Sequence, residues 1–388
     1  MKFFPIVIFY FFLLFYSINY LSFSFVEIDG IHHFPLLNHI LNISFLLFGK
    51  NDFALRLPSL FTGFLSVILF YKIAQIKLKR DKERIFATYI FMLIPGMIIS
   101  SVIVNKSVYL IFLTLLFIYT YEKIRIFSYV LLILYIFIDK SLISLYLALI
   151  FYSIYKKDTK FLIFSLILLA VNANYFEYKI HGKPKGYFID LFGTYFLIFS
   201  PFVFVYFLYA LYKNLFIKKD LIYFISATAF FLSMILSFRQ RIKIDDFAPY
   251  TLAFVINMVN IFLKSYKVRL PKFRKFYKLL FIILFSSLII FDVALFLNKY
   301  TPVRNLSYSF YFIKPLADYM KNKKIDYIYC KNEKLCKVLN FYGIKLGNKY
   351  YLNSSRYNVS IFHNKKLIMK IDVSKLNTLK KNSYKKDN

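Results

Sequence analysis

Long apolar runs separated by short basic blocks constrain this chain more than any other feature. A run of about 20 apolar residues is long enough to cross a bilayer as a helix. The chain has 388 residues, of which 60% are hydrophobic and 22% aromatic. A soluble domain of this size would be nearer half apolar. The sequence therefore predicts an integral membrane protein of the all-α, multi-pass class.

The apolar runs predict about eleven membrane helices, of which the shorter ones would be partly buried in protein. We expect them at residues 3–25, 54–76, 85–103, 107–121, 126–138, 141–155, 160–175, 191–212, 221–238, 248–264 and 279–297. The first run resembles a signal peptide but is too long and lacks a small-residue cleavage site, so we interpret it as an uncleaved anchor.

The positive charge indicates how the helices are oriented. The formal net charge is +33, and most Lys and Arg residues lie in blocks at alternate gaps: 77–84, 122–125, 156–160, 213–219 and 264–278. The positive-inside rule places these gaps, and with them the N-terminus, on the cytoplasmic side. Because no basic groove with interleaved aromatic residues lies outside the membrane segments, we expect no nucleic-acid partner.

The first outward segment, residues 27–51, is the candidate site. It places Glu27 and Asp29 near the end of a membrane helix, followed by a predicted interfacial helix at residues 35–48. Charged groups are costly at bilayer depth, so such a cluster indicates a site. A carboxylate beside apolar surface can act as a general base near neutral pH. Solvated loop acids or a helix cap are the alternative interpretation.

Three histidines follow these acids. If the segment is helical, His32 and His39 lie two turns apart on one face, with Asp29 one turn earlier and His33 next to the first histidine. Asp29, His32, His33 and His39 are therefore candidate ligands for a divalent metal. The alternative is a set of interfacial histidines without a ligand role, and the sequence identifies no cofactor with certainty.

Several cations lie in the outward gaps, against the orientation rule. Such cations are expected to have an anionic partner, and phosphate suits the two-pronged guanidinium group especially well. We predict that phosphate or donor binding involves Arg56, Lys106, Lys140, Arg239, Arg241 and Lys243. The alternative for the last three is that they extend to the interface or pair with Asp245 and Asp246.

The chain divides into a membrane domain (residues 1–298), a small α/β extracytoplasmic cap (299–375) and a disordered basic tail (376–388). In the cap, residues 314–323 predict a helix with Pro315 in its first turn. A strand at 325–330 and a helix at 333–340 follow, with Gly343 as a stop.

Cys330 and Cys336 are the only cysteines, and both lie in this cap. An oxidising compartment would permit a disulfide between them. Two separate thiols, one on the strand and one on the helix, are the alternative, because the sequence does not supply the distance between their Cα atoms.

Residues 48–59, Phe-Gly-Lys-Asn-Asp-Phe-Ala-Leu-Arg-Leu-Pro-Ser, resemble a signature of membrane glycosyltransferases of the C-superfamily. These are the protein-mannosyltransferase and aminoarabinose-transferase type, glycosyltransferase family 39. The likeness extends over about the first 160 residues, is thinner through 278, and includes Arg239-Gln-Arg-Ile-Lys243. It implies sugar transfer from a polyprenyl-phosphate donor to an acceptor lipid, lipid A, glycan or protein. The implied location is the periplasmic face of a bacterial inner membrane.

The resemblance assigns roles by position. Glu27-Ile28-Asp29 stands where the family has an acidic pair, which makes Asp29 the catalytic base with help from Glu27. Lys140 matches the lysine motif of the middle helices. Other motif positions differ: His33 stands where the family has a lysine before two prolines, and Lys106 lies where many members have an acid. A catalytically degenerate relative, or a non-enzymatic transporter of polyprenyl lipid, is therefore the alternative function.

The proposed reaction requires the outward acids and cations to converge on one pocket for a lipid phosphate headgroup. The sequence contains no Walker loop, dinucleotide fingerprint or Gly-x-Ser-x-Gly elbow, so ATP-driven transport by this chain is unsupported.

Overall fold

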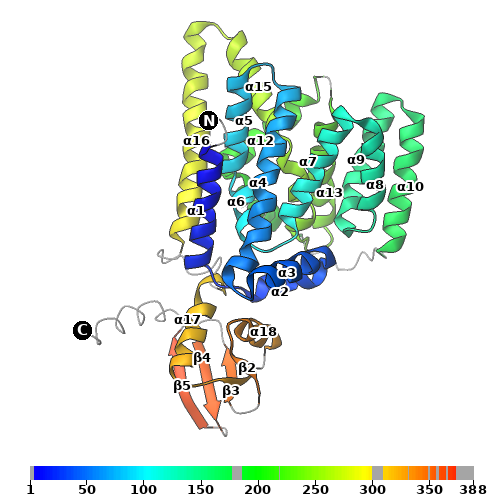
Figure 1. Cartoon of the computed structure of the whole chain (residues 1–388). Helices are drawn as coiled ribbons and strands as arrows, with labels where there is room; N and C mark the ends of the chain where they lie inside the picture. Colours follow the sequence, from blue (N-terminus) through cyan, green and yellow to red (C-terminus); the bar gives the residue numbers. More distant parts are fainter. Residues whose placement is uncertain are drawn as a thin grey trace. The chain divides into compact units, whose positions relative to one another are not determined.

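A computed structural model describes residues 4–176, 186–217, 219–298, 309–330, 332–347, 350–354, 358–363 and 366–372. The chain is mostly helical, with a small sheet near the C-terminus (Figure 1). Contacts divide it into two compact units. The helical unit contains residues 1–6, 61–101 and 106–296, and the mixed unit contains residues 7–60, 102–105 and 297–388. Each unit is described by itself.

The helical unit contains the second part of α4 and the helices from α5 to α16. Helix α9 packs against α10 and α13, and α7 packs against α8 (Figure 1). The bounds are α4 Asp52–Lys77, α5 Asp81–Leu93, α6 Pro95–Val102, α7 Ser107–Lys123, α8 Arg125–Tyr135, η1 Lys140–Leu142, α9 Ile143–Lys156, α10 Thr159–Tyr175, α11 Phe188–Phe199, α12 Pro201–Asn214, α13 Leu221–Ser237, η2 Ile244–Asp246, α14 Ala248–Leu252, α15 Val255–Val268 and α16 Pro271–Leu297.

Two segments that were expected to be single helices are bent. Helices α5 and α6 meet at 59°, and α11 and α12 meet at 103°. Each second helix begins with a proline, Pro95 or Pro201, which has no N–H for an intrahelical hydrogen bond and clashes with the preceding turn. The residue before each proline is non-helical: Ile94 is extended, and Ser200 has a φ of 68°.

Every segment expected to be a membrane helix contains a helix, but length and composition single out few of them. Among the described residues, α4 and α16 are each long and apolar enough to cross a membrane, and the number rises to five if each of three bent pairs forms one span. The structure is thus compatible with membrane association. The larger number of spans stays a prediction.

Basic turns meet at one end of the helical unit, which we call the basic end. The Lys77 ammonium lies 2.6 Å from Glu122 and 3.8 Å from Asp220, which joins the turns after α4, α7 and α12. Arg125 lies 2.6 Å from Asp158, which joins the starts of α8 and α10. The basic blocks that alternate in sequence are therefore neighbours in space.

The mixed unit joins early and late parts of the chain. Its elements are most of α1 (Phe4–Tyr20), α2 (Phe25–His33), α3 (Pro35–Phe48), the start of α4, α17 (Ser309–Asn322), α18 (Glu333–Phe341), β1 (Tyr327–Cys330), β2 (Lys345–Leu346), β3 (Tyr350–Ser354), β4 (Asn358–His363) and β5 (Lys366–Asp372). The sheet order is β2-β1-β3-β4-β5, in which β1 is parallel to β2 and β3, and the β3–β4 and β4–β5 pairs are antiparallel.

The expected succession of helix, strand and helix agrees with α17, β1 and α18, and Gly343 follows α18 with a φ of 92°. One detail differs, because α17 begins at Ser309 and Pro315 lies inside it. A proline there removes a helical hydrogen bond. Two backbone groups near this proline form hydrogen bonds with Ser22 instead. The Ser22 N–H donates to Phe310 O at 2.5 Å, and the Ser22 hydroxyl accepts from Lys314 N at 3.1 Å. The predicted tail, residues 376–388, lies outside the described residues.

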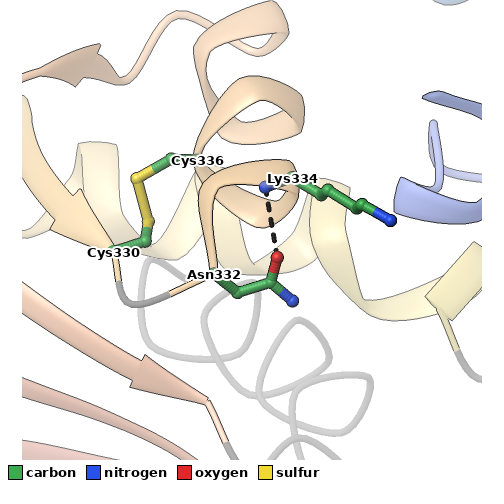
Figure 2. The surroundings of a disulfide bond; sticks show 4 residues. All are labelled: Cys330, Asn332, Lys334 and Cys336. Carbon is green, nitrogen blue, oxygen red and sulfur yellow. Dashed lines mark hydrogen bonds between the residues drawn. A yellow bond between two sulfur atoms is a disulfide. The ribbon is translucent and has the colours of Figure 1, made fainter. Parts of the chain in front are cut away.

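A disulfide joins Cys330 at the end of β1 to Cys336 in α18 (Figure 2). Their Cα atoms are 5.8 Å apart, within the usual range for a disulfide. Between them, the Asn332 side chain accepts a hydrogen bond from Lys334 N at 3.1 Å and caps the start of α18. The cap brings the first turn of the helix back toward the strand, so the short loop can close.

Candidate functional site

The acidic segment is a helix, α2, and Glu27 belongs to its N-terminal cap. Ser24 and Glu27 form a capping box, in which Glu27 Oε2 accepts from Ser24 N at 2.9 Å. The chain bends by 112° between α2 and α3. Glu27 is 1% exposed. The Ser-x-x-Glu spacing of Ser24 to Glu27 is the signal that would have predicted this helix start.

Glu27 is also paired with Arg56 of α4. Its Oε1 atom accepts from Arg56 Nη1 and, at 2.8 Å, from Val104 N, while Oε2 accepts from Arg56 Nη2 at 3.2 Å. The two Nη groups of Arg56 also donate to Val102 O and Ser22 O, each at 3.0 Å. These bonds offset much of the cost of burying the charge pair. Among the described residues, the Nε of Arg56 has no hydrogen-bond partner.

These contacts favour a structural role for Glu27 and Arg56. Arg56 is 1% exposed, and a phosphate would have to displace Glu27 to reach its Nη groups. The pair instead ties α2 to α4 and to the segment at Val102–Asn105, against which Gly30 of α2 packs with Val104 O 3.5 Å from the position of an added Cβ. Glu27, predicted to assist catalysis, and Arg56, predicted to bind phosphate, are therefore bound to each other.

Asp29 has the opposite environment. Its side chain is 44% exposed and lies 2.7 Å from the ammonium of Lys334 in α18. An exposed pair of this kind contributes little to stability, typically about 0–1 kcal/mol. Asp29 therefore stands at the surface of a helix whose other acid is buried and anchored, and its carboxylate can exchange the lysine for another partner.

The candidate metal ligands do not form a described cluster. His39 lies exposed on α3, and the side chains of His32 and His33 lie outside the described residues. Within the part of the chain that the structure describes, no group of three or more His, Cys, Asp or Glu residues could hold a metal ion.

A second acidic group, missed in the sequence, lies in the helical unit at the end opposite the basic end. The Lys106 ammonium lies 2.9 and 3.1 Å from the two oxygens of Asp139 and 2.5 Å from Asp246. The pKa of Lys106 is raised: burial lowers it, but the two carboxylates outweigh that effect. Lys106 directly precedes α7. Asp139 and Asp246 therefore lie near the start of that helix.

Asp245 completes this group, which we call the Lys106 cluster (Lys106, Ser107, Asp139, Asp245 and Asp246). Its Oδ1 atom accepts from the Ser107 hydroxyl at 2.9 Å. Burial raises the pKa of Asp245, the hydrogen bond from Ser107 opposes the shift, and the neighbouring Asp246 adds to it. The cluster thus contains three carboxylates and one ammonium, and one carboxylate has a raised proton affinity.

The cluster extends into the core through Asp139. This side chain also accepts from Ser141 N at 2.8 Å and so begins η1. The Ser141 hydroxyl lies 3.1 Å from the hydroxyl of Tyr250, a fully buried side chain of α14. These bonds tie three separate helix starts to one another, which gives the acids fixed positions.

The other predicted phosphate ligands are exposed. Lys140, Arg239, Arg241 and Lys243 all have exposed side chains. The alternative pairing of Arg239, Arg241 and Lys243 with Asp245 and Asp246 is not what the structure has, since those acids bond Ser107 and Lys106. Lys243 still contributes electrostatically to Asp245. Exposed cations of this loop can meet an anionic ligand from solvent.

The predicted site residues fall into two groups, one in each unit. Glu27, Asp29 and Arg56 belong to the mixed unit, and the remaining predicted cations belong to the helical unit. The outward position of Lys106, against the positive-inside rule, indicated that it should have an anionic partner. Only the fold shows that Asp139 and Asp246 are those partners.

Comparison with models of protein families, with curated proteins and with solved structures finds no match to this chain.

Proposed function

We propose that this chain is a membrane-embedded glycosyltransferase that moves a sugar from a polyprenyl-phosphate donor to an acceptor outside the cytoplasm. The observation that carries the proposal is Asp245, a half-buried carboxylate with a raised pKa that bonds the Ser107 hydroxyl and interacts with the exposed cation Lys243. A general base near neutral pH requires such an environment. Apolar helices long enough to cross a membrane provide the setting for a lipid-linked donor.

The reaction needs two kinds of group. The acceptor hydroxyl loses its proton to a carboxylate while its oxygen attacks the anomeric carbon, and the bond from that carbon to the phosphate oxygen breaks. The departing polyprenyl phosphate keeps the bonding electrons, and negative charge grows on it in the transition state. Cations placed there stabilise that charge. Arg239, Arg241 and Lys243, which precede Asp245 in the same loop, fit this role, and Lys140 is a further candidate.

Two carboxylates can serve as the base, each with different support. Asp245 is favoured by its environment, because it has a raised pKa and a hydroxyl rather than a cation as its hydrogen-bond partner. Asp29 is favoured by the resemblance of its segment and by its exposure. If the acceptor is itself a phosphate, no base is needed and the carboxylate would orient the acceptor.

A deletion strain complemented with variants tests the proposal. We expect Asp245→Asn or Asp29→Asn to abolish one glycan signal in mass spectrometry of surface polysaccharide, lipid A and periplasmic glycoproteins, with protein level unchanged. Matched controls are Asp190→Asn and Asp326→Asn, which remove exposed acids from the helical and the mixed unit, respectively.

A second pair of variants tests the phosphate role. Arg239→Ala with Arg241→Ala should weaken donor binding and reduce the same glycan. If the glycan is unchanged in these variants and in both acid variants, sugar transfer by this chain is refuted, and a non-enzymatic carrier of polyprenyl lipid becomes the better interpretation.

A further inference from the structure

A groove at the basic end of the helical unit lies between α5, α15 and α16. It has a volume of about 530 Å³. Three phenylalanine side chains, Phe86, Phe262 and Phe281, line it, one from each helix. Its lining is mainly apolar, yet it opens where the basic turns meet. The groove therefore combines an apolar interior with charged residues in its lining.

A second apolar cavity, of about 50 Å³, adjoins the groove. The two share Phe86, Phe262 and Phe281, and the second reaches Ile94, directly after α5, and Leu288 on α16. At 1.5 Å per residue, the path along α5 from residue 82 to residue 94 is about 18 Å long. Half of a bilayer's hydrocarbon core is about 15 Å. The apolar path is therefore about as deep as one leaflet.

The mouth of the groove has free positive charge. Lys82 of α5 and Lys278 of α16 line it, and neither ammonium forms an ion pair within the described parts of the chain. The acid in the lining, Glu83, is paired with Lys267. The two lysines thus line the groove from different helices, and no anion among the described residues pairs with either.

Two tyrosines of the mouth hold further cations. The Arg274 guanidinium lies 5.8 Å from the centre of the Tyr266 ring, and that of Arg269 lies 5.7 Å from the centre of the Tyr277 ring. Both tyrosines line the groove. Tyrosine is common at the level of lipid headgroups, because its ring is apolar and its hydroxyl is polar.

From these features we propose that the groove binds one anionic phospholipid of the surrounding bilayer. Its acyl chain fills the aromatic path, and its phosphate lies between Lys82 and Lys278. A zwitterionic lipid would leave the excess positive charge unmatched, whereas each Lys or Arg near a surface adds attraction for an anionic lipid. This site lies at the end of the helices opposite the Lys106 cluster, and it does not depend on sugar transfer.

The test uses the purified full-length protein in detergent, titrated with phosphatidylglycerol or phosphatidylcholine and followed by native mass spectrometry. We expect one phosphatidylglycerol to bind roughly tenfold more tightly than phosphatidylcholine, and Lys82→Ala with Lys278→Ala to remove that preference. Leu263→Trp, which fills the groove, should weaken both lipids. The control, Lys123→Ala with Lys160→Ala, removes two exposed lysines of the same end outside the groove and should change binding less than twofold.

Three outcomes would overturn the proposal. Equal loss in the control would mean general attraction to the basic end. Equal binding of the two lipids, or no effect of Leu263→Trp, would mean that the groove is not the site. Tighter binding of a polyprenyl phosphate than of phosphatidylglycerol, lost in the Lys82 and Lys278 variant, would assign the groove to the carrier lipid instead.

Discussion

Arg56 of α4 and Glu27 of α2 are a fully enclosed ion pair between residues 29 positions apart in the chain, with Arg56 Nη2 3.2 Å from Glu27 Oε2. Four donors converge on the carboxylate, so its charge is satisfied inside the protein. Asp29, two residues later in the same helix, is exposed. One acid of the motif therefore holds the helix in place while the other remains available.

Arg56→Met should destabilise the protein by about 3–5 kcal/mol, because Glu27 would be left as a buried charge without its cation. Glu27→Gln combined with Arg56→Met should recover much of this loss. Thermal unfolding followed by circular dichroism in detergent measures both. Arg125→Met, which removes the cation of a largely exposed pair, is the control and should change stability by less than about 1 kcal/mol. Simple addition of the two single effects would contradict the pairing.

Lys106→Met should also destabilise the helical unit, since Asp139 and Asp246 lose their shared cation. In the wild type, the pKa of Lys106 is raised from 10.5, so the ammonium stabilises the fold at neutral pH and this contribution is lost as the pH rises above that value. The melting temperature of the wild type should therefore fall in that range more steeply than that of the variant. Parallel curves would mean that Lys106 is not the titrating group.

Asp245→Asn should stabilise the protein at neutral pH. The pKa of Asp245 is raised in the folded protein above 3.8, its ordinary value, so folding favours the protonated form. The wild type therefore loses stability as the pH rises from 3.8 to the pKa of the folded state. The asparagine mimics the protonated side chain. Melting temperatures of the two proteins should agree near pH 3.5 and separate near pH 7. A difference that is constant with pH would contradict the shift.

Replacing Cys330 and Cys336 with serine should destabilise the mixed unit by about 2 kcal/mol, the chain-entropy value for so short a loop. Limited proteolysis of the full chain should then cut faster within residues 309–347. The wild type treated with reductant serves as the comparison and should behave like the double variant. Modification of either cysteine by a thiol reagent before reduction would contradict the disulfide.

The positions, breaks and starts of helices in this chain can be predicted from neighbouring residues. The positions of the helices follow from apolar length, and their breaks at Pro95 and Pro201 follow from the missing N–H of proline. The start of α2 follows from the Ser-x-x-Glu spacing of Ser24 and Glu27.

By itself the sequence determined which segments are helical, where basic turns separate them and that a small α/β region ends the chain, because length, periodicity and turn residues act over short distances. Only the tertiary structure decided which charge meets which. Arg56 pairs with Glu27, Lys106 pairs with Asp139 and Asp246, and Asp29 lies at the surface. Such choices depend on the burial of both partners at once, and burial is a property of the packed chain rather than of any one segment.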